Sequence, residues 1–334
     1  MATRKRTNSY WRKRAEERLL RSEKQSLEYQ KEIERIYRKA QKEILKELVD
    51  LYDKCYDKSI GFKKQLLDMK ITYSDMRKLT IKIEQLKLKD KLPENYKGRI
   101  TRLEKMSLDI WTEIHKAGLE HERVEERMNR KIFSESYYKS GYDVSRGIGS
   151  TPVSFTTLDR QTIEQVINAK FNGMNYSERI WRNTDILANQ LKERLVVAVA
   201  TGQGIEKTSR EFRERFGVQK YYAERLVRTE TNYFHNAGEV ESYRKLGFEY
   251  FTFIATLDNR TSEICAEMDG KTFKITEAEA GLNVPPLHPN CRSTIAAAFK
   301  GFEPETRRYR DPGTGKNKYI YNLNYEAWLE TIKK

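Results

Sequence analysis

The chain has 334 residues, of which 34% are charged and 38% are hydrophobic, and its formal net charge is +15. This balance predicts two or three domains built largely from solvated helices, and the positive charge predicts a polyanionic partner such as nucleic acid. Three cysteines exclude a disulfide framework, and no apolar run of about 18 residues is present to span a membrane. The basic amino terminus lacks the apolar segment of a secretory signal, so we expect synthesis in a cytoplasm.

Residues 1–14 predict a flexible basic arm. The segment holds six basic residues and no acidic one, interrupted by Tyr10 and Trp11. Such a composition is typical of an arm that contacts DNA phosphates, although a solubilising chain end looks the same. The candidate DNA-contacting residues are Arg4, Lys5, Arg6, Arg12, Lys13 and Arg14.

Residues 15–140 predict a domain of long helices. From Leu27 to Tyr52, apolar residues recur at intervals of three and four, which places them on one inward face. No glycine or proline occurs before Gly61, so the first helix is expected to be long and unbroken. Its apolar stripe requires a partner helix.

A change in composition predicts a linker at residues 141–155, between the long helices and a second helical domain. Gly141 and Gly147 lie at its start, and more glycine and a proline follow. Further helices are predicted before this linker, over residues 62–69, 75–88 and 99–140.

Residues 156–246 predict a central helical domain. Its helices are predicted over residues 159–170, 177–200, 208–216 and 219–246, with Gly217 separating the last two. Arg228, Asn232 and Asn236 recur at intervals of four and therefore share a helix face. A polar row on an otherwise apolar helix favours a satisfied structural network over a site, because buried polar groups usually find partners.

From residue 247 the hydrophobic period changes to two, which predicts a small α+β domain at residues 247–300. Its expected strands form a short antiparallel sheet and cover residues 250–254, 271–275 and 295–299. Residues 301–334 predict a basic, aromatic tail that docks on a protein or on DNA. The expected fold class is therefore mostly α, with long N-terminal helices, a central helical domain and a small C-terminal α+β domain.

Cys265, His288 and Cys291 offer two thiolates and an imidazole, the ligand types that suit Zn²⁺. A structural zinc site needs four ligands, and Asp258 or His235 is a candidate for the fourth. Two buried thiols beside a hydrogen-bonded histidine are the plainer interpretation, because free cysteine is among the most buried residue types. A Cys265–Cys291 disulfide is a further alternative outside a reducing cytosol.

A proline-rich loop precedes the last predicted strand. Pro285, Pro286 and Pro289 deny it a helical conformation and fix an extended course. Asp258 follows one predicted strand and Arg292 precedes another, so we expect the two strand ends to meet and these residues to form a structural ion pair.

Motifs between Arg228 and Arg292 carry a family resemblance. The downstream pattern is Asp258-x-Arg260-Thr261, Cys265, Asp269-Gly270 and Pro285-Pro286-x-His288-Pro289-x-Cys291-Arg292; the upstream pattern is Arg228-Thr229-Glu230 with Asn236 and Gly238. Over residues 155–300 the chain resembles the phage Mu protein F-like family of minor head, or head morphogenesis, proteins. The motif residues that we expect to be structural are Arg228, Glu230, Asn236, Asp258, Arg260, Thr261, Asp269, Gly270, Pro286 and Arg292.

The resemblance implies a low-copy minor capsid protein that acts at the portal and inner head during procapsid assembly and DNA packaging or ejection. The implied partners are portal protein, capsid or scaffold proteins and viral double-stranded DNA. The implied location is the virion head interior near the portal, after assembly in the host cytoplasm. Some relatives carry an additional C-terminal toxin domain, and we expect the chain after Phe299 to be too short for one.

No complete catalytic constellation is visible in the sequence, so we expect a protein that is not an enzyme. The alternative hypothesis is a metal-dependent, nuclease-like enzyme acting on DNA, with Cys265, His288 and Cys291 as metal ligands and Asp258 as a base or a ligand.

Overall fold

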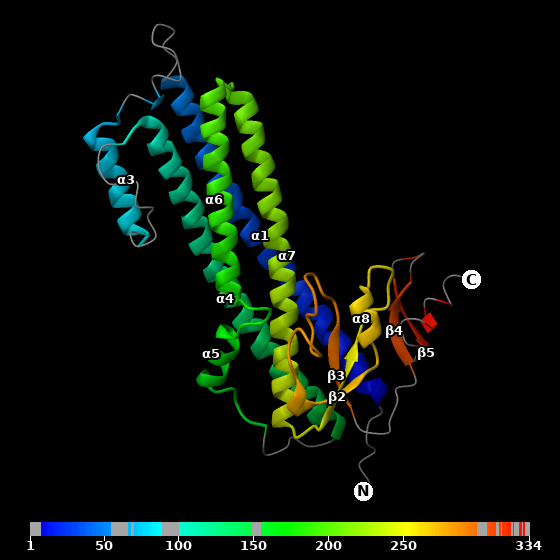
Figure 1. The fold of residues 1–334 in the computed structure, drawn as a ribbon. Helices are drawn as coiled ribbons and strands as arrows, with labels where there is room; N and C mark the ends of the chain where they lie inside the picture. The colour runs from blue at the N-terminus through cyan, green and yellow to red at the C-terminus, as the bar shows by residue number, and fades with distance from the viewer. Residues whose placement is uncertain are drawn as a thin grey trace. The chain divides into compact units, whose positions relative to one another are not determined.

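The computed structural model describes residues 8–54, 66–67, 70–88, 100–148, 155–298, 306–311, 314, 316–321, 323, 327–328 and 330. Figure 1 shows long helices followed by a small sheet, which confirms the expected fold class. The helices are α1 (Asn8–Lys54), α3 (Tyr73–Gln85), α4 (Arg102–Ile148), α5 (Arg160–Asn168), α6 (Tyr176–Thr201), α7 (Ile205–Lys245) and α8 (Glu263–Met268). In the described part of the chain, no helix combines the length and the apolar character needed to cross a membrane.

Helix α1 includes the end of the segment that the sequence predicts to be a flexible arm. The helix begins at Asn8 among the described residues, so that prediction is wrong for residues 8–14, and residues 1–7 lie outside the description. Trp11 explains the difference because its ring packs edge-on against Phe248, with a centroid distance of 6.1 Å. Burying this ring orders the first turns of the helix.

The buried face of α1 includes serines at positions where a search for apolar residues alone finds nothing. Ser22 and Ser26 are buried and continue the spacing of three and four between Leu19 and Ile33. The prediction that Leu27 faces inward is wrong, since its side chain is 50% exposed. A pattern built on apolar residues alone misses a face on which buried serines alternate with leucine and isoleucine.

Helix α4 continues into the predicted linker. It runs to Ile148, so the linker prediction is wrong for residues 141–148, while residues 149–154 lie outside the description. The glycines there permit close packing: a Cβ atom on Gly141 would lie 2.0 Å from the ring of Phe155, and one on Gly147 would lie 2.2 Å from Trp11. Glycine is therefore required at both helical positions, because the neighbouring rings leave no room for a Cβ atom.

Helices α5 and α6 confirm the predicted helices at residues 159–170 and 177–200, and Asp159 caps α5 by accepting a 2.7 Å hydrogen bond from the Thr162 amide. Helix α7 differs from its prediction because it continues through Gly217 without a break. An interior glycine costs only about 1 kcal/mol relative to alanine, and good helix formers on both sides outweigh that cost.

The small sheet has the strand order β2-β1-β3, and both pairs are antiparallel. Its strands are β1 (Tyr250–Ile254), β2 (Thr272–Lys274) and β3 (Thr294–Ala298), close to the predicted ranges. Phe251 pairs with Phe273 on one side and with Ala297 on the other, so the central strand carries the core aromatic residues. The 3-10 helix η3 (Ile275–Glu277) follows β2 directly and begins the long loop to β3.

The predicted C-terminal tail contains regular structure. Strands β4 (Thr306–Arg310) and β5 (Asn317–Tyr321) form an antiparallel pair, which the sequence analysis does not predict for this basic, aromatic tail. Asp311 stabilises the turn between them, because its Oδ1 atom accepts a 2.9 Å hydrogen bond from the Thr314 amide. Tyr309 forms a parallel bridge with Leu257 and a ring contact with Trp328.

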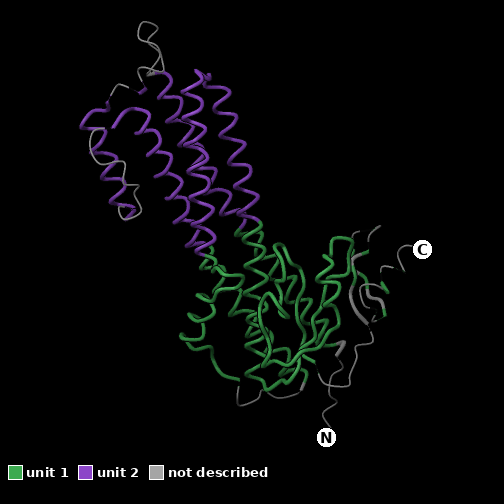
Figure 2. Tube along the Cα trace, viewed as in Figure 1, with its two compact units in different colours: residues 1–29, 125–176, 225–334 green, residues 30–124, 177–224 purple. Residues whose placement is uncertain are grey.

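Two compact units divide the chain (Figure 2). Unit 1 comprises residues 1–29, 125–176 and 225–334 and contains the sheet; unit 2 comprises residues 30–124 and 177–224. Because α1, α4 and α7 each contribute to both, the units interleave in sequence, unlike the consecutive domains that composition predicts. The core of unit 2 includes Ile71, Leu88 and Leu108, whereas that of unit 1 includes Tyr243, Phe251 and Ile295.

Candidate functional site

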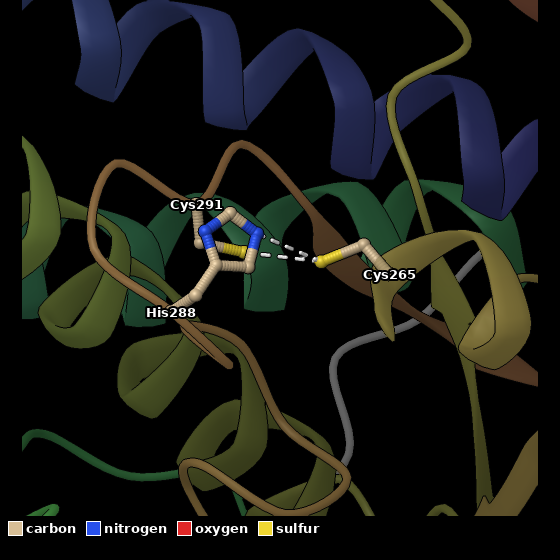
Figure 3. A group of neighbouring side chains, drawn as sticks. All are labelled: Cys265, His288 and Cys291. Atoms are coloured by element: carbon tan, nitrogen blue, oxygen red, sulfur yellow. Dashed lines mark hydrogen bonds between the residues drawn. The ribbon is translucent and has the colours of Figure 1, made fainter. Parts of the chain in front are cut away.

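The structure brings the three predicted metal-ligating residues together in unit 1. Cys265 lies on α8, whereas His288 and Cys291 lie on the loop before β3, and Figure 3 shows their side chains pointing toward one another. The Sγ atom of Cys265 is 3.3 Å from Nε2 of His288 and 3.6 Å from Sγ of Cys291. All three ligand atoms lie within 4.8 Å of one another.

Helix α8 begins after Ser262, whose backbone carbonyl accepts hydrogen bonds from the amides of Cys265 and Ala266. This single turn presents the Cys265 side chain to the proline loop. The loop contains Pro285 and Pro286, which are joined by a cis peptide bond and are both buried. It runs through bends at Leu287 and His288 and a turn at Pro289 and Asn290, so the predicted extended course is wrong. Asn290 adopts a left-handed conformation with φ 60°, which turns the chain between His288 and Cys291.

The two thiols are buried and form a hydrogen bond with each other. The hydrogen bond with Cys291 and burial raise the pKa of Cys265, whereas the same hydrogen bond lowers the pKa of Cys291 against the effect of burial. The contact with Cys291 also raises the pKa of His288. Cys291 is therefore the thiol of the pair that loses its proton first.

Neither predicted fourth ligand joins the cluster. Among the described residues, the group that could hold a metal contains Cys265, His288 and Cys291 and no further Cys, His, Asp or Glu. Both carboxylate oxygens of Asp258 instead accept hydrogen bonds from Arg292. The prediction of Asp258 or His235 as fourth ligand is therefore wrong.

Asp258 and Arg292 form the ion pair that the sequence predicts. Nη2 of Arg292 lies 2.7 Å from Oδ1 of Asp258, and Nη1 bonds Oδ2, so the guanidinium binds the carboxylate through two parallel hydrogen bonds. Burial alone raises the pKa of Asp258, but the hydrogen bonds and charge of Arg292 outweigh it and hold that pKa below its ordinary value. Thr256 strengthens the link, since its hydroxyl donates a 2.6 Å hydrogen bond to the Arg292 carbonyl.

The remaining residues of the Asp258 motif have local structural roles. The Arg260 amide donates a 2.9 Å hydrogen bond to Oδ1 of Asp258, while its side chain is mostly exposed. The Thr261 hydroxyl donates to the Thr256 carbonyl and closes the turn after β1. These contacts define the turn that leads into α8.

Asp269 and Gly270 form the predicted turn before β2. Oδ1 of Asp269 accepts a 2.9 Å hydrogen bond from the Ala255 amide, and the carboxylate is buried. Gly270 has φ +80°, a conformation that disfavours a side chain, and its amide donates to the Phe253 carbonyl. The pair therefore ties the end of α8 back onto β1.

A polar row on α7 binds the segment that contains the proline loop. Nδ2 of Asn232 donates a 2.8 Å hydrogen bond to the Ser293 carbonyl, and Oδ1 of Asn236 accepts from Thr294 at 3.1 Å. The expected structural network is confirmed for these two asparagines. Arg228 does not share their surroundings, because its side chain is exposed.

Thr229 and His235 also connect α7 to this segment, and the sequence interpretation missed these contacts. Oγ1 of Thr229 accepts a 3.1 Å hydrogen bond from the Asn290 amide. His235 is fully buried; its Nδ1 lies 2.8 Å from the hydroxyl of Ser136 and its Nε2 lies 3.3 Å from that of Thr294. Burial lowers the pKa of His235 to about 4. Glu230, another motif residue, is buried on the same helix.

A buried ionic network was likewise not foreseen. Arg18 donates two 2.6 Å hydrogen bonds to the carboxylate of Glu239 and a third of 2.6 Å to Asp143. Tyr243 donates a 2.7 Å hydrogen bond to Glu239. The signal available in the sequence was weak, since these residues come from three helices far apart along the chain.

The candidate DNA-contacting residues have different surroundings. Arg12 is buried, Arg14 binds Glu17 at 2.8 Å, and Lys13 is exposed. Burial makes Arg12 unsuitable for a phosphate, so that prediction is wrong for this residue. Arg4, Lys5 and Arg6 lie outside the described residues.

Comparisons with known proteins address the family. Residues 189–296 match the family model described as "Phage Mu protein F like protein". The chain is also 22% identical, over 192 residues, to "NAD(+)--arginine ADP-ribosyltransferase EFV" of Enterococcus faecalis (strain ATCC 700802 / V583), a match that covers 53% of this chain and 39% of that protein. No solved structure matches the chain. The matched segment contains α7, β1, β2 and the first residues of β3, and the resemblance to the phage Mu protein F-like family is thereby confirmed for residues 189–296.

Proposed function

We propose that this protein is a phage minor capsid, or head morphogenesis, protein that acts at the portal and inner head during procapsid assembly and DNA packaging or ejection. The observation that carries the proposal is the family match, because residues 189–296 include the polar row of α7, the Asp258–Arg292 pair and most of the sheet. The proposal gives the protein a structural role in a particle, in low copy number.

The internal bonding of the motif residues supports an assembly role. Asp258 is occupied by Arg292, Asp269 by the Ala255 amide and Asn236 by Thr294. Groups that already satisfy one another stabilise a shape and are not free to act on a substrate. A rigid fold of this kind suits a component that docks on a larger shell.

The charge of the chain supports non-specific contact with viral double-stranded DNA. The net charge is +15, and three of the basic residues, Arg4, Lys5 and Arg6, are consecutive near the amino terminus. Such a basic composition favours binding to phosphates through counterion release, without reading a base sequence. Inside a filled head, the packaged genome is the polyanion that it would contact.

Co-expression with the portal protein of the same phage tests the proposed docking. We expect this protein to sediment with assembled portal rings at a few copies per ring and to remain bound after a salt wash that removes DNA. Sedimentation as a free protein at all protein concentrations tested, with portal rings that are themselves intact, would contradict a portal partner. An unrelated phage portal of similar charge serves as the control for non-specific binding.

A metal-dependent reaction on DNA is the second candidate, and the cluster of Cys265, His288 and Cys291 is the observation that favours it. Against it, both thiols are buried and the Asp258 carboxylate is bound by Arg292. A plasmid-nicking assay with Zn²⁺ and with Mg²⁺ separates the candidates: cleavage that disappears in Cys291→Ser supports the enzyme. The transferase activity in the name of the enterococcal relative is that protein's property, since the match spans 39% of its length.

A further inference from the structure

We infer that Cys265, Cys291 and His288 bind one zinc ion, which cross-links α8 to the proline loop. The inference does not rest on the proposed function, because it follows from the positions of three side chains. Cys265 lies 23 residues before His288 and 26 before Cys291, so the ion would join two separate connections of the sheet, one between β1 and β2 and the other between β2 and β3.

The interatomic distances fit a tetrahedral zinc ion. Bonds of about 2.3 Å to sulfur and about 2.0–2.1 Å to nitrogen, at tetrahedral angles, place two sulfurs about 3.8 Å apart and a sulfur about 3.6 Å from a nitrogen. The structure has 3.6 Å between the sulfurs of Cys265 and Cys291, and 3.3 Å between Cys265 Sγ and His288 Nε2. Zinc therefore requires shifts of only about 0.2–0.3 Å in these two distances.

A disulfide fits these positions less well. Its sulfurs must approach to about 2.05 Å, whereas those of Cys265 and Cys291 are 3.6 Å apart. His288 also has no role in a disulfide, although its Nε2 atom lies against the Cys265 sulfur. A shared metal ion explains why Cys265, His288 and Cys291 all point to one place, whereas a disulfide would involve only the two cysteines.

The orientation of His288 is that of a metal ligand. Its Nδ1 atom lies 2.9 Å from the Pro289 carbonyl oxygen, which can only accept, so Nδ1 carries the proton. The lone pair is then on Nε2, the atom that faces Cys265 and lies 2.8 Å from the Ser262 hydroxyl. A backbone carbonyl that fixes the tautomer in this way is a common outer partner of metal-bound histidine.

Charge balance favours zinc in this buried place. When Zn²⁺ binds, two S–H bonds break, two Zn–S bonds form, and two protons pass to solvent. Two thiolates and a neutral imidazole then cancel the charge of the ion, which removes the penalty for burying either charge alone. Because the described residues supply three ligands, the fourth position of the tetrahedron is left to solvent.

Metal analysis of the full-length protein tests the inference. The protein is purified under reducing conditions, exposed to excess Zn²⁺, desalted and analysed by elemental mass spectrometry; we expect one zinc per chain. Cys265→Ser, Cys291→Ser and His288→Asn are expected to weaken zinc binding by more than roughly 100-fold, the upper limit for loss of an outer partner alone. Cys55→Ser is the matched control, because it removes the remaining cysteine of the sequence and should leave the zinc in place.

The wild-type measurement decides the question even if a ligand variant does not fold. The inference would be overturned if wild-type protein held no more zinc than Cys265→Ser. It would also be overturned if protein purified without reductant had an intact mass lower by two hydrogen atoms and took up no zinc after reduction. Replacement of zinc by Co²⁺ provides a second readout. We expect the intense visible bands of tetrahedral cobalt and a sulfur-to-cobalt charge-transfer band in wild type, and a weaker band in Cys291→Ser, which keeps one of the two thiolates.

Discussion

Arg292 binds Asp258 side-on, with two parallel hydrogen bonds that join the segment before β3 to the turn after β1. The carboxylate is almost fully buried, and the guanidinium retains 26% of its side-chain exposure. A charge pair in this position cannot lose one partner without leaving the other charge poorly solvated. Replacement of Arg292 should therefore lower the free energy of unfolding of the part of the chain that contains the sheet.

We predict that Arg292→Ala lowers the free energy of unfolding by about 3 kcal/mol, the lower end of the cost of breaking a buried pair, because Arg292 is partly exposed. Arg292→Lys should cost about 1–2 kcal/mol, since lysine keeps the charge but not the two-pronged contact. Arg260→Ala is the control: its side chain is 65% exposed and lies 3.7 Å from the same carboxylate, so the cost should be below about 0.5 kcal/mol. Urea unfolding followed by circular dichroism measures all three, and equal costs for Arg292→Ala and Arg260→Ala would disprove the ranking.

Two glycines on α7 should respond to alanine in opposite directions. A Cβ atom on Gly238 would lie 2.6 Å from the Phe133 carbonyl oxygen and 3.0 Å from the Tyr137 amide nitrogen, both of them backbone atoms of α4. Gly238→Ala should therefore cost about 1–3 kcal/mol through overpacking. Gly217 has open space around the same position, so Gly217→Ala should stabilise the helix by about 0.5–1 kcal/mol. Thermal unfolding of the two variants checks the sign, and a stabilising Gly238→Ala would contradict the close approach of these helices.

His235 should make stability depend on pH. Burial lowers its pKa to about 4, and the nearby charges are Glu239, Arg18 and Lys139. In the unfolded chain His235 takes up a proton near pH 6.5, whereas in the folded protein it does so only at about pH 4. The contribution of neutral His235 to the free energy of unfolding is therefore complete above about pH 6.5 and is lost as the pH falls toward 4. A shift of this size corresponds to about 3 kcal/mol.

The measurement is a series of urea unfolding curves between pH 4 and pH 7, for wild type and for His235→Gln. The wild type should lose stability across this interval more steeply than the variant, because glutamine does not titrate. Parallel curves for the two proteins would show that the titration of His235 does not contribute.

The proposed DNA contact predicts a steep dependence of binding on salt. Replacing Arg4, Lys5 and Arg6 with glutamine should reduce the slope of log affinity against log salt by up to about 2.7, at about 0.9 for each phosphate that is no longer neutralised. Replacing Lys207, Arg210 and Arg213, which are exposed on α7, gives the same change in net charge and should alter the slope less. Fluorescence anisotropy with a short duplex measures both, and equal effects would attribute the binding to net charge alone.

Particular residues show which features were predictable from the sequence. The three strands and the Asp258–Arg292 pair follow from a period-two pattern with charged residues at strand ends, which is local information. The convergence of Cys265 with His288 and Cys291 was predicted because cysteine and histidine are common metal ligands and these three lie near one turn and one loop. Such features depend on residue types and patterns within one short part of the chain, since Asp258 and Arg292 are 34 residues apart and Cys265 and Cys291 are 26 apart.

Features set by long-range packing were not predictable. Leu27 is exposed because Ser22 and Ser26 occupy the buried face of α1. Gly147 lies inside a helix because the ring of Trp11, more than a hundred residues earlier, fills the space that a side chain would need. The buried state of His235 depends on hydroxyl groups from α1 and α4. No local pattern contains these contacts, so propensity and spacing assign such residues to the wrong environment.

The location of the protein in the particle decides whether it has the proposed role in the head. Phage heads produced by cells that carry the gene for this chain are purified, an epitope tag on the protein is located by electron microscopy, and its copy number is measured by quantitative mass spectrometry. We expect a few copies per head, confined to the portal vertex, and defective heads when the gene is deleted. Heads that lack the protein altogether, together with normal head yield after deletion, would contradict the proposed role.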